Sequence, residues 1–142
     1  MADAPAFVLE SFAMLAYLQG EKHGVRVREI FQRAQSDRRS IYMSLINIGE
    51  VLYITERRQG MQKAQDTLAL LRQLPVEVLP ADEPTVFAAA HIKANYNVSY
   101  ADSFAIVVAQ TVGGTLITGD PEFGAVEDIV NIEWLQKSAD KP

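Results

Sequence analysis

The chain has 142 residues, 49% of them apolar and 22% charged, which is the size and composition of one soluble globular domain. It contains no cysteine, so disulfides and thiolate metal sites are excluded, and any metal needs oxygen ligands or a histidine. The net charge of −5 counts against a protein that coats nucleic acid nonspecifically, because such binding depends on clustered Lys and Arg.

Short apolar runs alternate with segments of helical periodicity in the first half of the chain. The apolar run FVL at residues 7–9 suits a buried strand, and Gly60 marks the boundary between two consecutive helices. The predicted elements are a strand at 7–9, helices at 11–19 and 25–34, a strand at 41–43, and helices at 45–58 and 61–73.

The same alternation continues in the second half. Ser99 begins a segment with the form of a capping box, in which Asp102 is the acid three residues on. The helix that it starts runs to Val112, ahead of two glycines. The other predicted elements are a strand at 76–79, a helix at 83–95, a strand at 115–118, a helical turn from Asp120 and a strand at 131–134.

Alternating strands and helices predict an α/β fold in which a mainly parallel central sheet is flanked by helices. The chain shows no repeat, low-complexity tract or linker, so we expect residues 1–142 to form a single domain. No apolar run reaches the roughly 20 residues that cross a bilayer, and the N-terminus lacks the basic start of a signal peptide. The expected compartment is the cytoplasm, without membrane contact.

Four acidic residues are expected at one edge of this sheet. Ligand sites of open parallel sheets lie outside the carboxyl ends of the strands. Glu10 directly follows the first predicted strand, and Asp120 lies just past the fourth. A crossover helix begins at the same edge, which places Asp102 in a first turn and Glu50 in a second turn there. We therefore expect these four carboxylates on one rim.

Crowded carboxylates repel one another, and either a raised pKa or a bound cation relieves the repulsion. Mg²⁺ and Mn²⁺ prefer oxygen ligands, and Mg²⁺ is commonly held by one or two carboxylates and several waters. Such an ion can polarise a phosphoryl oxygen and generate hydroxide for attack on a phosphodiester. The rim therefore favours a divalent-metal site for phosphodiester hydrolysis.

Three of the four acids also have structural explanations. Asp102 completes a capping box with Ser99, and Asp120 before Pro121 has the form of an N-cap. Glu10 can be read as an exposed acid that is stabilised by the dipole of the following helix. These explanations leave the roles of the three residues open.

Glu50 is harder to explain as a surface residue. Its helical neighbours at three and four positions are mostly apolar, with Asn47 as the polar exception. A carboxylate on an apolar face needs a partner. The structural alternative to a metal is a salt bridge to Arg57 or Arg58.

Four segments together resemble the PIN domain family. The similarity covers residues 7 to about 134, and the four segments occur in the family's order. Each segment alone is a weak signal, and the set is fairly specific. The segments are FVLESFAMLAYL at 7–18, NIGEVL at 47–52, SYADSFA at 99–105 and LITGDPEF at 116–123. By size and motif the chain looks most like VapC-type toxins of toxin/antitoxin pairs.

This resemblance implies a PIN-like three-layer sandwich and an endoribonuclease that depends on Mg²⁺ or Mn²⁺. It implies a homodimer that acts on RNA and is held inactive by a cognate antitoxin. By position, Glu10, Glu50, Asp102 and Asp120 would form the acidic catalytic and metal-binding set. The supporting polar residues would be Ser11, Asn47 and Thr118.

The chain departs from the family at one position. Glu10 stands where the family usually has Asp, and the extra methylene displaces the carboxylate by about 1.5 Å. Metal-centred chemistry is sensitive to displacements near 1 Å. The alternative hypothesis is therefore a catalytically weakened or silent PIN-like module that acts by binding a partner or RNA.

Two further features bear on ligands. Residues 1–73 contain 10 of the 13 basic side chains and 8 acids, so this half is net positive and could meet a polyanion, although solvated helix faces explain the same residues. His23 and His91 lie far from the acidic motifs, and we expect no ligand role for either.

Overall fold

A computed structural model describes residues 4–135 of the protein. The core of this region is one five-stranded sheet with the strand order β3-β2-β1-β4-β5, in which all four neighbouring pairs are parallel. The strands are β1 (Phe7–Leu9), β2 (Ile41–Ser44), β3 (Glu77–Leu79), β4 (Thr115–Thr118) and β5 (Asn131–Trp134).

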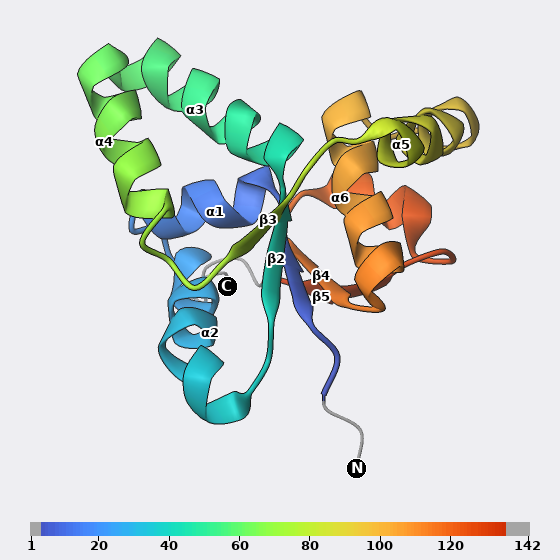
Figure 1. The fold of residues 1–142 in the computed structure, drawn as a ribbon, viewed down its shortest axis with the longest axis horizontal. Coiled ribbons are helices and arrows are strands. Elements are labelled where there is room, and N and C mark those ends of the chain that lie inside the picture. Colours follow the sequence, from blue (N-terminus) through green and yellow to red (C-terminus); the bar gives the residue numbers. More distant parts are fainter. Residues whose placement is uncertain (1–3, 136–142) are drawn as a thin grey trace, which may run out of the picture.

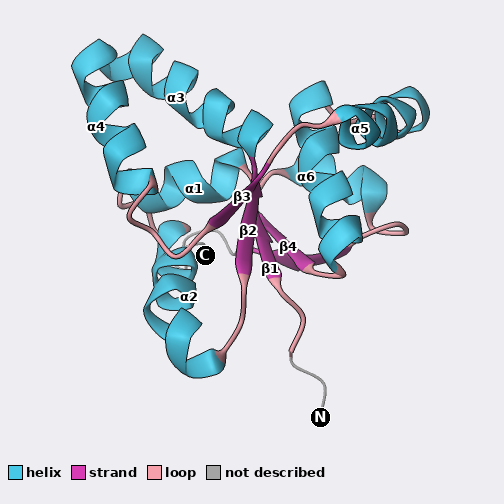
Figure 2. Cartoon of the chain, in the orientation of Figure 1, coloured by secondary structure: helices cyan, strands magenta, loops and turns pink. Residues whose placement is uncertain are grey.

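Helices cover both faces of the sheet, as Figure 1 shows, and the strands form the middle layer in Figure 2. One face carries α1 (Ser11–Leu18), α2 (Gly24–Asp37), α3 (Leu45–Gln59) and α4 (Met61–Leu71). The other face carries α5 (Glu83–Asn95), α6 (Tyr100–Val112) and the short 3₁₀ helix η1 (Pro121–Val126). The predicted three-layer α/β sandwich is confirmed.

Alternation along β1 explains the two cores. Phe7 and Leu9 point to one face and pack in a cluster with Met14 and Val27 of the α1 and α2 layer. Val8 points to the other face and packs in the cluster that contains Phe104 of α6. Because both faces are covered, a three-residue strand can be apolar at every position.

One helix is longer than its sequence pattern indicates. The predicted helix at 25–34 is α2, which continues to Asp37 and ends where Arg38 adopts the left-handed conformation, with φ of 53°. A left-handed cap is usually Gly or Asn, so an arginine there gives no stop signal. None of the helices in residues 4–135 is long and apolar enough to span a membrane.

Strand register brings the candidate acids to one level. Leu9 at the end of β1 pairs with Met43 of β2 and Ile117 of β4. The carboxyl ends of these central strands are therefore aligned. Glu10 follows β1, Gly119 and Asp120 follow β4, and β2 ends at Ser44, which caps α3.

Candidate active site

A cavity of about 270 Å³ opens at this carboxyl edge, between α1, α3, α6 and η1. Five carboxylates line it, together with hydroxyl and apolar groups. The carboxylates are Glu10, Glu50, Asp102, Asp120 and Glu122, and the other lining residues are Ser11, Phe12, Leu15, Ile54 and Ser99. The structure thus brings the four acids predicted from the sequence to one pocket and adds a fifth.

Glu10 is buried, with 1% of its surface exposed. It is the N-cap of α1, and its Oε1 accepts a 2.6 Å hydrogen bond from the backbone amide of Ala13. Burial raises the pKa of Glu10 to about 8, against the lowering effect of the backbone amides of Ala13 and Phe12. The reading of Glu10 as an exposed acid is wrong: without a cation, its carboxyl group is mostly neutral at pH 7.

Asp102 is also largely buried, with 7% of its surface exposed. Burial raises its pKa to about 8, and a hydrogen bond with Glu122 adds to the shift. The same hydrogen bond lowers the pKa of Glu122. The hydrogen bond that Glu122 accepts from the Ser99 amide lowers this pKa further. Asp102 therefore holds the proton of this pair, and Glu122 carries the charge.

The capping box predicted for α6 is formed differently. The Ser99 hydroxyl caps α6 by accepting a 3.0 Å hydrogen bond from the Asp102 amide, as expected. The Ser99 amide, however, donates a 2.7 Å hydrogen bond to Oε1 of Glu122. Asp102 is therefore not the acid that closes the box.

Asp120 combines capping with a place in the pocket wall. Its Oδ1 accepts a 2.9 Å hydrogen bond from the amide of Glu122, which caps η1. Its own amide donates a 3.0 Å hydrogen bond to Oγ1 of Thr118, a buried residue at the end of β4. The predicted N-cap is present, and the same carboxylate lines the cavity.

Glu50 finds its partner in α1. The Ser11 hydroxyl donates a 2.5 Å hydrogen bond to Oε1 of Glu50, and it also lies 3.3 Å from the carbonyl oxygen of Asn47. In residues 4–135, neither Arg57 nor Arg58 forms an ion pair with Glu50. The salt-bridge alternative is therefore not realised there.

Asn47 connects the helices that carry two of the acids. It is fully buried, and its Nδ2 donates a 3.1 Å hydrogen bond from α3 to the carbonyl oxygen of Ala101 in α6. Its Oδ1 is the one buried side-chain oxygen or nitrogen in the described region without a hydrogen-bond partner. Asn47 thus positions Glu50 relative to Asp102 and leaves one acceptor free.

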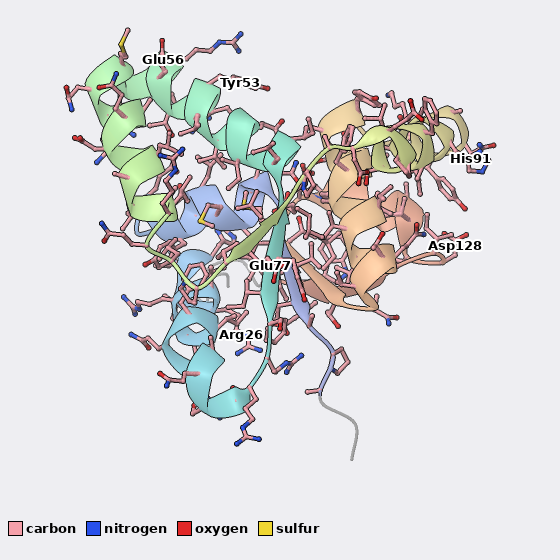
Figure 3. The ribbon with its side chains drawn as sticks, in the orientation of Figure 1. Arg26, Tyr53, Glu56, Glu77, His91 and Asp128 are labelled. Atoms are coloured by element: carbon pink, nitrogen blue, oxygen red, sulfur yellow. The ribbon has the colours of Figure 1, made fainter. Side chains whose placement is uncertain are left out.

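The histidines lie outside the pocket. His23 precedes α2 and forms a T-shaped contact with the Phe12 ring, with ring centroids 5.6 Å apart. His91 lies on the exposed surface of α5, away from the central sheet (Figure 3). Neither lines the cavity that the five carboxylates share.

The donor set suits a hard divalent cation. Five carboxylates share one pocket, and protons on Glu10 and Asp102 relieve part of the repulsion. Within residues 4–135, no three acidic or histidine side chains are placed to hold an ion together. Mg²⁺ needs only one or two direct carboxylates, because it keeps several waters. The residues therefore fit such an ion; which carboxylates would bind it stays a prediction.

Comparison with known proteins identifies the family of this chain. The sequence model of the PIN domain family matches residues 7–129. The chain belongs to the PIN domain family. No curated protein matches the sequence of this PIN domain significantly.

Solved structures share the fold of this PIN domain. A chain of the DNA-bound VapBC complex from Salmonella typhimurium is 20% identical with a TM-score of 0.72, covering 94% of this chain and 100% of that one. VapC20 of Mycobacterium tuberculosis, described as a toxin that cleaves the sarcin-ricin loop, is 20% identical with a TM-score of 0.67, covering 85% and 95%. A chain of a toxin-antitoxin complex from Klebsiella pneumoniae is 13% identical with a TM-score of 0.68, covering 94% and 100%.

Proposed function

We propose that this PIN domain is a metal-dependent endoribonuclease and the toxin of a toxin/antitoxin pair, acting in the cytoplasm. The observation that carries the proposal is the gathering of five carboxylates in one pocket at the carboxyl edge of the sheet. A set of acids without a lysine or arginine among the lining residues suits a cation and the phosphodiester that the cation attracts.

Mg²⁺ or Mn²⁺, when bound, would supply Lewis-acid polarisation of a phosphoryl oxygen and a water of lowered pKa. Glu10, Asp102 and Asp120 would hold the ion. Glu50, oriented by the Ser11 hydroxyl, would accept a hydrogen bond from the attacking water and position it. Asn47 and Thr118 would keep the helix and strand ends that carry these acids in place.

The partners follow from the relatives. The matched chains from Salmonella and Klebsiella come from complexes described as VapBC and as toxin-antitoxin. VapC20 is described as a cleaving toxin. By this likeness we assign a cognate antitoxin as the regulator of this chain and RNA as its substrate. The proposed homodimer rests on the resemblance of the sequence motifs to VapC-type toxins.

The test is cleavage of a structured RNA by purified protein with Mg²⁺ or Mn²⁺. We expect cleavage that stops with a chelator and falls at least 100-fold in Asp102→Asn, which is the scale for loss of a metal-site group. Asp128→Asn is the control, because Asp128 is an exposed acid outside the pocket. Cleavage that survives Asp102→Asn would overturn the assignment of the site.

A second candidate function is supported by Glu10. Its carboxyl group is buried, caps α1 and is mostly neutral at pH 7, which favours a weakened or silent PIN domain that acts by binding. Glu10→Asp restores the acid usual in the family and keeps a side chain well suited to an N-cap. If neither form binds Mn²⁺ or cuts RNA, the binding module replaces the enzyme.

A further inference from the structure

One face of α3 continues from the pocket to the outer surface. Glu50 and Ile54 line the cavity. Tyr53 and Arg57 follow Glu50 by three and seven residues, the spacing that places side chains on one stripe of a helix. Tyr53 therefore lies one turn beyond Glu50, and Arg57 lies two turns beyond it.

The two side chains form a pair at the surface. Tyr53 is 48% exposed, and the guanidinium carbon of Arg57 lies 5.0 Å from the centroid of its ring. Arg57 is exposed, and it has no ion pair with a carboxylate of residues 4–135. The pair thus presents an aromatic ring and an uncompensated positive charge to the solvent.

The acidic pocket explains why a positive charge and an aromatic ring nearby would help to hold RNA. Five carboxylates line the cavity, so a phosphate chain that approaches it without a bound cation meets repulsion. Nearby cations and stacking surfaces are the two elements by which proteins hold single strands of any sequence. Arginine near the end of α3 also interacts favourably with the helix dipole, but that interaction does not require an exposed aromatic partner.

We propose that Tyr53 and Arg57 form a subsite for single-stranded RNA beside the carboxylate pocket. A base stacks on the Tyr53 ring, and a neighbouring phosphate of the same strand meets the Arg57 guanidinium. The subsite rests on the proposed ribonuclease function for its substrate. This subsite holds one part of the strand outside the pocket. The carboxylates in the pocket therefore stay free to act on the phosphodiester bond that is cut.

The experiment measures binding, which does not require turnover. Fluorescence anisotropy of a labelled 12-nucleotide single-stranded RNA is titrated with protein in Mg²⁺, with Asp102→Asn present in every form to prevent cleavage. Tyr53→Ala should raise Kd about fivefold or more, because stacking is lost. Tyr53→Phe keeps the ring and should stay within about twofold of the parent.

The charge is tested by salt dependence. Arg57→Gln should reduce the slope of log affinity against log salt by about 0.7, the value for one phosphate contact of a single strand. Arg28→Gln removes the same charge from an exposed position of α2 and should leave the slope unchanged. In the view of Figure 3, Tyr53 of α3 lies near the top and Arg26 of α2 lies in the lower half.

Two outcomes overturn the subsite: parental affinity in both Tyr53→Ala and Arg57→Gln, or an equal loss in Arg28→Gln. If Tyr53→Ala and Arg57→Gln both bind RNA as tightly as the parent, the pair is instead a surface for a protein partner. The proposed function fails separately, when protein with the natural Asp102 does not cleave RNA. Weakened binding in Tyr53→Ala and Arg57→Gln would support the subsite even then.

Discussion

The backbone amide of Ser99 donates a 2.7 Å hydrogen bond to the carboxylate of Glu122, which lies 23 residues further along the chain. The Ser99 hydroxyl accepts a hydrogen bond from the amide of Asp102, which forms one half of the cap of α6. The contact with Glu122 forms the other half from a separate segment of the chain. The Asp102 carboxylate is therefore not used in capping. It lines the pocket, where it holds a proton and forms a hydrogen bond with Glu122.

Glu122→Gln should move the acid limb of the pH–activity profile to lower pH. Glutamine keeps an oxygen for the Ser99 amide but removes the negative charge that contributes to the raised pKa of Asp102. Asp102 then loses its proton, and becomes able to bind a cation, at a lower pH. Cleavage rates with Mn²⁺ from pH 5 to 9 check this shift. Glu56→Gln, at an exposed position of α3, is the control; matching profiles in the two variants would contradict the coupling.

The metal-free protein should lose stability as the pH rises from 5 to 9. Burial raises the pKa of Glu10 from 4.5 to about 8, so folding favours its neutral form. This stabilisation is fully present below about pH 4.5 and is lost as the pH rises through 8, by up to about 1.4 kcal/mol per pH unit between these values. Urea unfolding in a chelator measures it.

Glu10→Gln supplies the comparison for this pH dependence. Glutamine cannot ionise, so its free energy of unfolding should fall less steeply between pH 5 and 9 than that of the parent. Glu83→Gln, at an exposed position of α5, should follow the parent. Parallel curves for the parent and Glu10→Gln would mean that Glu10 is not neutral in the fold.

Ser11→Ala should weaken activity more than folding. The Ser11 hydroxyl is the donor that holds Glu50 at 2.5 Å, and groups that orient metal-site residues typically contribute 10- to 100-fold. We expect a loss of about that size in the Mn²⁺-dependent cleavage rate, with a cost of about 1 kcal/mol in stability. Ser36→Ala, which removes an exposed hydroxyl from α2, should change neither. Equal activity in the two variants would remove Ser11 from the site.

Gly24→Ala should destabilise the fold strongly, and Gly49→Ala should not. A β-carbon at Gly24 would lie 2.4 Å from the carbonyl oxygen of Ala16, so α1 and α2 would have to separate. A β-carbon at Gly49 meets nothing within 4 Å and lies inside α3, where alanine gains roughly 0.5–1 kcal/mol. Thermal unfolding of both variants measures the difference, and a Gly24→Ala protein as stable as the parent would contradict the close packing of α1 on α2.

Local patterns were sufficient to predict the layers of the fold. A run of three apolar residues at Phe7–Leu9 indicates a strand because both faces of the sheet are covered, and each residue is buried. Glu10 directly follows one strand and Asp120 lies two residues past another, which also predicts their common edge, since parallel neighbours end in register. The number of residues between each acid and the end of its strand is enough to predict that the acid lies at this edge.

Long-range contacts are where local patterns fail. The hydrogen bond from Ser99 to Glu122 joins segments that are distant in the sequence, and the one local hint was that Glu122 lies two residues after Asp120 in the motif LITGDPEF. The burial of Glu10 depends on the surrounding cores rather than on its neighbours in the chain. The sequence therefore could not predict that Glu10 in particular has a raised pKa.

A crystal structure determined with Mn²⁺ would show whether the carboxylate pocket binds a divalent cation. We expect an anomalous peak inside the carboxylate pocket, in direct contact with Asp102 or Asp120 and bridged by water to the remaining acids. The ion should be absent from crystals of Asp102→Asn grown in the same way. A peak only at another position, or no peak at saturating Mn²⁺, would contradict the assignment of this pocket as a metal site.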